Sequence, residues 1–197
     1  VDGRDIYIVP MVNPDGVEFD IADGRYKWQR KNMQPNRTSK PGVDLNRNYP
    51  FRWGALGEVG SSSKPQSFYY RGAEPGSEPE TRAMMRIAES EHFVASISYH
   101  TGTVAVLAPY TIDNVKDPTP NEAWLVGEQL VASLPPHPQG RLFSLRHKLY
   151  SVDGTDQDYY RARFGTLAYL VEGARRDAKD AAERYAVVHA VRPSWMQ

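Results

Sequence analysis

The second half of the sequence alternates short apolar runs with longer amphipathic stretches, and this alternation limits the possible folds most. The apolar runs, which predict buried strands, are residues 93–99, 104–107 and 166–171. The stretches with helical periodicity or helix-start residues are 77–90, 122–134, 154–163 and 178–191. At the start of the first of these, Ser77 has the position of a helix cap. Strands that alternate with helices indicate an α/β fold.

The N-terminal part of the chain has a different character. Residues 6–12 form a short β-rich apolar run, which predicts another buried strand, and the Asn-Pro-Asp-Gly of residues 13–16 predicts a turn that ends it. The chain then stays rich in Gly, Pro, Ser, Asn and Arg, with little periodicity, up to about Gly76. Disordered segments are poor in aromatic residues, whereas this one is rich in them. We therefore interpret it as an ordered loop that builds a site.

Composition and charge exclude several classes of function. The 197 residues suffice for one domain, and Lys+Arg balance Asp+Glu at 24 each, so no net charge attracts nucleic acid or an acidic membrane. No apolar run approaches the roughly 20 residues of a membrane span. Because Cys is absent, any metal must bind to His and carboxylate side chains. The start at Val1, without Met, indicates a processed, truncated or partly observed product.

Two polar residues follow predicted strands directly. His100 comes after the run that ends at Tyr99, and Glu172 comes after the run that ends at Val171. In open α/β sheets the ligand crevice lies beyond the carboxyl ends of the strands. An imidazole and a carboxylate placed there are candidates for metal binding and acid–base chemistry. Their position alone is equally compatible with hydrogen bonds that cap the strand ends.

Another candidate is the Asn46-Arg47-Asn48 triplet. Arg presents a planar fork of donors that matches a carboxylate in bidentate fashion, and a neighbouring Asn can donate to the same oxygens. The triplet therefore has the composition of a carboxylate clamp. Taken by itself, such a triplet is also typical of a solvated turn.

The ordered set of motifs closely resembles the zinc metallocarboxypeptidases of the carboxypeptidase A, B and T type. The bacterial carboxypeptidase T-like branch is nearest, through residues 46–54 and the Ser-rich stretch after them. The resemblance implies a mixed, mostly parallel sheet flanked by helices, with residues 1–197 as the C-terminal two-thirds of a single catalytic domain. The motifs that carry it are residues 13–16, 28–32, 42–48, 70–72, 77–81, 98–100, 150 with 153–154, and 171–172.

The resemblance implies catalytic roles for three residues. His100 matches the third zinc ligand of the family, which comes from a strand well after the first two. Glu172 matches the general base that takes a proton from zinc-bound water and returns it to the leaving amine. Arg30 matches the guanidinium that polarises the scissile carbonyl. Without the resemblance, Arg30 would be interpreted as part of a solvated basic loop.

The resemblance also implies how a substrate is held. Asn46 and Arg47 match the pair that binds the C-terminal carboxylate of a peptide, and Tyr150 matches the mobile tyrosine that closes over it. Within the stretch that sets side-chain preference, Asp156 and Gln157 are candidate substrate contacts, which favours a mixed or basic preference. Asp153 and Asp158 match structural positions, where Asp caps the next helix.

The sequence departs from the family in its zinc ligands. The first two ligands of the family come from a His-x-x-Glu motif before the Asn-Pro-Asp-Gly turn, and none of the five His here has Glu three positions later. Catalytic zinc normally takes three protein ligands and a water. We therefore expect this chain alone to be inactive and to bind zinc weakly, and we expect the motif in the segment upstream of Val1.

The expected function is zinc-dependent removal of single residues from peptide C-termini. From the resemblance we also expect a secreted or periplasmic protein that is monomeric when complete and has no nucleic-acid or membrane partner. A peptidoglycan stem-peptide amidase on the same scaffold is one alternative, although the Asn46, Arg47 and Tyr150 set argues against it. A non-catalytic module that binds C-termini is another. Zinc content and hydrolysis of free-acid and amidated substrates would separate the three functions.

Overall fold

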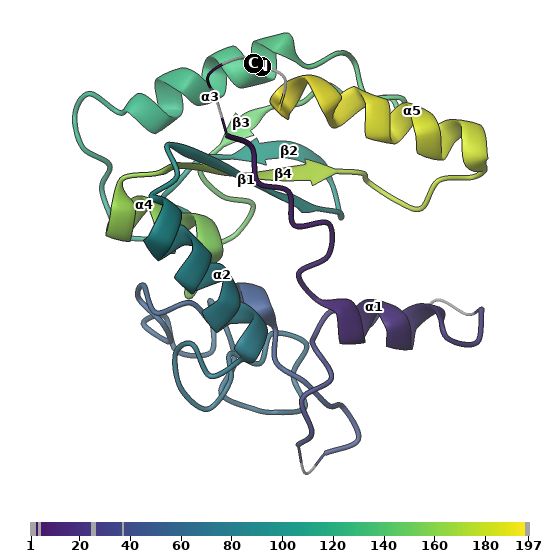
Figure 1. Cartoon of the computed structure of the whole chain (residues 1–197), viewed down its shortest axis with the longest axis vertical. Coiled ribbons are helices and arrows are strands. Elements are labelled where there is room, and N and C mark those ends of the chain that lie inside the picture. The colour runs from purple at the N-terminus through teal and green to yellow at the C-terminus, as the bar shows by residue number, and fades with distance from the viewer. Residues whose placement is uncertain (1–2, 4, 25–26, 37, 196–197) are drawn as a thin grey trace.

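The computed structural model of the chain describes residues 3, 5–24, 27–36 and 38–195. Its four-stranded sheet has the order β1-β4-β2-β3 (Figure 1). The strands are β1 (Ala95–His100), β2 (Val104–Leu107), β3 (Leu145–Arg146) and β4 (Leu167–Gly173). β1 is parallel to β4 and β2 is parallel to β3, whereas β2 and β4 are antiparallel. The sheet is thus mixed, as predicted.

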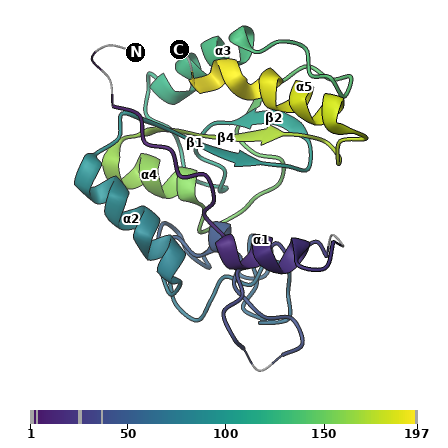
Figure 2. The same cartoon turned by 45° about the vertical axis from the view of Figure 1, so that its right-hand side comes forward.

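Helices cover both faces of this sheet. The helices α3 (Glu122–Ser133) and α5 (Ala181–Val191) pack on one face, and α2 (Pro79–Glu91) and α4 (Asp156–Phe164) lie on the other (Figures 1 and 2). The larger apolar core, under α3 and α5, includes Val106, Tyr169 and Val171, and a smaller one on the α2 and α4 side includes Ala168. Within the described part of the chain, no helix is long and apolar enough to cross a membrane.

The register of β4 places Glu172 on the side of the sheet that α2 and α4 cover. Side chains alternate between the faces of a strand. Since Tyr169 and Val171 contribute to the core under α3 and α5, Glu172 points to the opposite face. His100 is the partner of Glu172 in the parallel ladder, so its side chain lies on the same face. The pairing therefore brings the two predicted strand-end residues together.

The predicted helices and strands of the second half exist, most of them with shifted ends. β4 does not end before Glu172 but continues through Gly173, because β1 pairs with it up to Glu172 and β2 pairs with it up to Gly173. Similarly, His100 is the last residue of β1 rather than the residue after it. Glu78, not Ser77, precedes α2 as its cap residue, and the hydroxyl of Ser77 donates to the Glu78 carboxylate. The short β3 was not predicted.

Two predictions for the N-terminal part are wrong. Residues 6–12 form no strand and are exposed, with Ile8 reaching 75% exposure. The described chain covers them only in part, through the contacts of Tyr7 with Phe93 and Glu91. The Asn-Pro-Asp-Gly sequence is the start of helix α1 (Pro14–Ile21) rather than a turn. Asn13 caps that helix by accepting a hydrogen bond from Gly16 N–H at 3.1 Å, and Pro14 occupies the first helical turn. Both features also characterise turns, which explains the error.

The long segment between α1 and α2 is irregular except for the 3-10 helix η1 (Leu45–Arg47). A further 3-10 turn, η2 (Arg192–Trp195), follows α5. The irregular segment is held by buried polar side chains. Asn32 accepts from Val43 N–H at 2.8 Å and donates to Glu78 at 2.7 Å. Gly42 lies so close to this network, with φ +89°, that a Cβ would stand 1.7 Å from the Asn32 carbonyl oxygen.

Candidate active site

A cavity at the carboxyl ends of β1 and β4 brings together all the predicted site residues except Asp156. They come from separate parts of the chain: the irregular segment, the two strands, the stretch before α4, and α4 itself. The predicted residues that line the cavity are Arg30, Asn46, Arg47, His100, Tyr150, Gln157 and Glu172. Segments more than 100 residues apart thus converge on one site.

Arg47 is buried at the end of η1, with 3% of its surface exposed. Its Nη1 donates to the carbonyl oxygen of Asn46 at 2.6 Å, and its Nη2 donates to the Tyr150 hydroxyl at 3.2 Å. Nε is buried and has no partner, and no Asp or Glu of the described residues forms an ion pair with this guanidinium. A buried cation without an acidic partner is costly, so the position suits an anionic ligand.

Asn46 is oriented by its neighbours so that its amide nitrogen is available. Its Oδ1 accepts a hydrogen bond from Asp156 N–H at 2.9 Å, and its own backbone N–H donates to Asp44 at 3.2 Å. Since the Asp156 N–H can only donate, the side-chain oxygen must face it and Nδ2 must point elsewhere. Nδ2 can therefore donate to a ligand bound beside Arg47.

Arg30 is held by Asp44, a residue that the sequence analysis did not select. Nε of Arg30 donates to Oδ2 of Asp44 at 2.7 Å, and the Asp44 side chain is 3% exposed. The Asp44 carboxylate raises the pKa of Arg30 above its ordinary value, although burial opposes the shift. Because this contact engages Nε, the terminal nitrogens of Arg30 remain for a ligand. No spacing in the sequence connects Asp44 with Arg30, so this partner could not be predicted from it.

Glu172 lies in β4 with one carboxylate oxygen unsatisfied. Its Oε2 is buried and has no hydrogen-bond partner, and the carboxylate accepts from Thr103 N–H. Burial raises the pKa of Glu172 above its ordinary value, while Arg30 and the Thr103 N–H oppose the shift. A raised pKa makes a carboxylate a stronger base, and the free oxygen is where it can accept a proton. Neither Thr103 nor its N–H could be selected from sequence spacing.

His100 lies beside Glu172 at the end of β1. Burial lowers the pKa of His100, and Asp156 opposes the shift, so the ring favours the neutral form that binds metals. The zinc site implied by the resemblance nevertheless does not fit the described residues. Across residues 3, 5–24, 27–36 and 38–195, no group of three or more His, Cys, Asp or Glu is arranged to hold a metal ion. His100 is thus a single ligand candidate.

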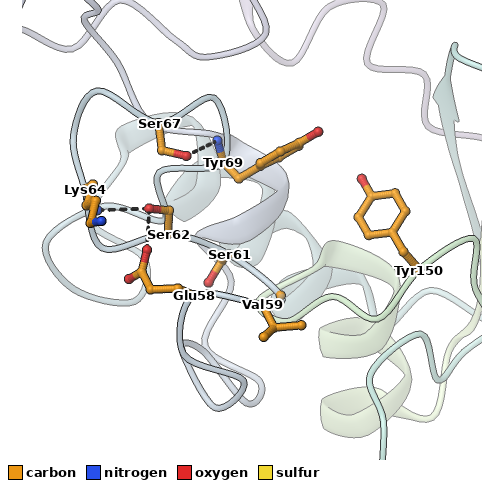
Figure 3. Close-up of a pocket in the computed structure, with 9 residues that line it drawn as sticks. Glu58, Val59, Ser61, Ser62, Lys64, Ser67, Tyr69 and Tyr150 are labelled. Atoms are coloured by element: carbon orange, nitrogen blue, oxygen red, sulfur yellow. Dashed lines mark hydrogen bonds between the residues drawn. The ribbon is translucent and has the colours of Figure 1, made fainter.

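Tyr150 stands at the mouth of the cavity, half exposed, with its hydroxyl next to Arg47. It also lines a neighbouring groove of about 460 Å³, which is formed largely by residues 58–69 (Figure 3). The hydroxyls of Ser61, Ser62 and Ser67 in that groove already bond to protein groups. These groove hydroxyls therefore already have hydrogen-bond partners, whereas Arg47, Gln157 and Glu172 of the cavity each have a buried polar atom without one.

The floor of the cavity combines apolar walls with one amide. Leu107, Val152 and Leu170 line it together with Gln157, whose Oε1 is buried without a partner. Asp156 does not line the cavity; its backbone orients Asn46, and its carboxylate Oδ1 is buried and unpartnered. The floor thus offers an acceptor oxygen that a ligand could satisfy.

Asp153 and Asp158 anchor loops around the site, and neither caps α4, whose cap residue is Thr155. Asp153 accepts from Leu56 N–H at 2.9 Å. Asp158 accepts from the N–H groups of Thr111 and Ile112, and burial raises its pKa to about 6. Both aspartates therefore have structural positions, but they stabilise loops rather than the helix start.

The protein-family model for zinc carboxypeptidases matches residues 1–186. Metallocarboxypeptidase A of Trichophyton tonsurans is 36% identical over 168 residues, which cover 81% of this chain and 38% of that protein. A zinc carboxypeptidase of Saccharothrix mutabilis subsp. capreolus is 58% identical over 57 residues, 29% of this chain and 13% of that protein. The chain thus spans about two-fifths or less of these relatives.

Solved structures show the same fold. Bovine thrombin-activatable fibrinolysis inhibitor, in complex with tick carboxypeptidase inhibitor, superposes with a TM-score of 0.76 at 27% identity and covers 93% of this chain and 64% of that chain. Murein-tripeptide amidase MpaA from Escherichia coli O157 has a TM-score of 0.56 at 21% identity, over 93% of this chain and 65% of that chain. At 21% identity, the similarity to the amidase is evidence for the fold only.

Proposed function

This chain belongs to the zinc carboxypeptidase family, and from that premise we propose that the protein carrying it removes single residues from the C-terminal ends of peptides. The observation that carries the proposal is Arg47. It is a buried guanidinium with an unpartnered Nε and no acidic partner among the described residues, at the edge of a cavity. A peptide C-terminus brings the planar carboxylate that such a group binds in bidentate fashion.

Two neighbours complete the carboxylate clamp. Nδ2 of Asn46 is directed by the Asp156 N–H and supplies a further donor for the same carboxylate. Tyr150 already contacts Arg47 through its hydroxyl, and a half-exposed tyrosine can move as a peptide enters. Recognition of a free carboxylate by this set would restrict cleavage to the last peptide bond.

Arg30 and Glu172 supply the chemistry on the substrate side of the clamp. With Nε bound to Asp44, the terminal nitrogens of Arg30 can donate to the carbonyl oxygen of the scissile bond and stabilise the charge that develops on it. Glu172 accepts the proton of the attacking water on its free oxygen and gives a proton to the leaving amine. The raised pKa of Glu172 makes its carboxylate a stronger base for the first of these transfers.

The described residues do not supply a complete set of ligands for the zinc that the family implies. His100 is the one candidate, and we propose that the remaining ligands lie outside these 197 residues. One imidazole cannot fill a tetrahedral site, so the 197-residue chain should lose zinc during dialysis against a mild chelator. Stoichiometric zinc retained by this chain would show that it forms a complete site.

The cavity floor supports a mixed or basic preference for the residue that is removed. The apolar walls accept an aliphatic side-chain stem, and the unpartnered Oε1 of Gln157 accepts a hydrogen bond from a donor at its end. Substrates that end in Lys, Arg, Gln or Leu, compared by kcat/KM, test this preference. An acidic residue should be the poorest, because its carboxylate cannot donate to Gln157.

The experiment that tests the proposed function uses the full-length protein with a blocked dipeptide and its C-terminal amide. Release of one amino acid from the free acid, with kcat/KM for the amide lower by about 30-fold or more, is expected from the clamp. Equal rates would favour the amidase alternative, and binding without hydrolysis in the zinc-loaded protein would favour the non-catalytic one. Secretion and a monomeric state stay predictions from the family resemblance.

A further inference from the structure

The ring of Tyr69 contacts both arginines of the candidate site. The Cζ atom of Arg30 lies 5.6 Å from the centre of this ring, and the Cζ atom of Arg47 lies 5.7 Å from it. A guanidinium within about 6 Å of an aromatic face is attracted by the negative potential of the ring. One side chain therefore makes the same type of contact with the group that would bind the carboxylate and the group that would polarise the carbonyl.

Two hydrogen bonds hold the backbone of Tyr69 in its loop. Tyr69 N–H donates to the hydroxyl of Ser67 at 3.1 Å, and its carbonyl accepts from Ser62 N–H at 2.8 Å. Ser62 is fixed in turn, because its hydroxyl donates to Glu58 at 2.7 Å. In Figure 3 the ring projects from this loop toward Tyr150. The position of Tyr69 is thus set by the loop, independently of any ligand.

We propose that Tyr69 is a positioning residue, which holds Arg30 and Arg47 in the orientations that receive the C-terminal carboxylate and the scissile carbonyl. Two guanidinium groups that converge on one cavity repel each other, and a shared aromatic ring offsets part of that repulsion. Each arginine also has unpartnered or ligand-directed nitrogens, so protein hydrogen bonds leave its orientation incompletely determined. Contact with the ring supplies the missing restraint and lowers the reorganisation needed on binding.

A purely structural role is the competing explanation, and the same loop contains a matched control. Phe68 is also half exposed, and its ring lies 5.6 Å from Nζ of Lys40, a residue that does not line the cavity. Phe68→Leu therefore removes a comparable contact from the adjacent position without touching the site. If Tyr69→Leu changes the kinetics and Phe68→Leu does not, the change is due to the lost contacts with Arg30 and Arg47.

The test rests on the proposed function and uses the full-length protein with a blocked dipeptide and its amide. Tyr69→Leu should raise KM for the free acid by about 3- to 30-fold, through Arg47, and leave KM for the amide nearly unchanged. It should also lower kcat for both substrates, through Arg30. Tyr69→Phe should retain most of both parameters, and Phe68→Leu should behave as the unmutated protein.

The outcomes separate this inference from the proposed function. If the unmutated protein does not distinguish the acid from the amide, the clamp is wrong and the role of Tyr69 falls with it. If the unmutated protein distinguishes them and Tyr69→Leu keeps the same ratio, only the role of Tyr69 is overturned. Should Tyr69→Leu fail to fold, Phe and its increasingly fluorinated analogues at position 69 keep the shape and weaken the ring potential. Discrimination should fall stepwise along that series, and a flat series contradicts the inference.

Discussion

Residues 6–12 and residues 42–49 reverse the usual relation between hydropathy and burial. The first segment is apolar, yet Ile6, Ile8 and Val9 are exposed. The second contains Asp44, Arg47 and Asn48, which are buried with at most 3% of their surface exposed. The difference teaches that burial in this chain follows the available partners. The polar segment is surrounded by donors and acceptors, whereas the described chain offers the first segment little apolar surface beyond the ring of Phe93, which Tyr7 contacts.

The buried polar side chains of residues 42–49 differ in whether all their hydrogen-bonding atoms have partners. Asn48 has partners for both ends of its amide, since Nδ2 donates to Arg71, Glu74 and Ser77 and Oδ1 accepts from Glu78 N–H. The buried Nε of Arg47, in contrast, has no partner. We expect residues with complete hydrogen bonding to contribute to stability, and residues with missing partners to contribute to function.

Glu172→Gln should give the largest effect, a loss of activity, and it tests whether a residue with a missing partner contributes to function rather than stability. Gln keeps the shape of a side chain with an unsatisfied buried oxygen but cannot accept the proton of water. In the complete protein kcat should fall by about 10²-fold or more, with zinc content and KM nearly unchanged. Folding should be affected little, because no well-paired carboxylate is lost. A near-normal kcat, or loss of zinc, would remove Glu172 from the role of general base.

Asn48→Ala should show the opposite pattern. The substitution leaves the carbonyls of Arg71 and Glu74 and the N–H of Glu78 without their buried partner. The free energy of unfolding should fall by about 1–3 kcal/mol, as measured by urea denaturation. Asn36→Ala, on a partly exposed turn, is the control and should cost less than about 1 kcal/mol. Comparable losses at both positions would contradict the importance of burial.

The smallest effect on the free energy of unfolding is expected in residues 6–12. The substitution Val→Ala can be compared there and at a buried position. Val106 is fully buried in the central strand β2, whereas Val9 is 44% exposed. Val106→Ala should cost about 2 kcal/mol of unfolding free energy, from lost transfer energy and the resulting cavity. Val9→Ala should cost less than about 0.5 kcal/mol in the 197-residue chain. A cost at Val9 close to that at Val106 would mean that residues 6–12 are covered.

The sequence predicts an element best where its hydropathy pattern matches its burial in the structure. Residues 104–107 were predicted with the observed ends, because a continuous apolar run suits a strand buried on both faces. The family match confirms the resemblance and the fold, and the cavity gathers the predicted residues except Asp156. Their catalytic and binding roles stay predictions.

Features that depend on distant contacts could not be predicted. The exposure of residues 6–12 depends on which surfaces are present, and hydropathy carries no such information. The pairing of Arg30 with Asp44, and the contact of Tyr69 with two arginines, join positions that no spacing rule connects. The extension of β4 past Glu172 likewise results from its neighbours in the sheet rather than from its own sequence.

Arg47, which is buried and has an Nε without a partner, is proposed to bind a C-terminal carboxylate. The most direct measurement is a thermodynamic cycle in the full-length protein, which combines Arg47→Ala with amidation of a blocked amino acid ligand and determines the four dissociation constants by calorimetry. We predict a coupling free energy on the order of 2–4 kcal/mol, because either change alone removes the same charge-assisted contact. A coupling near zero, with Arg47→Ala weakening acid and amide equally, would contradict the clamp.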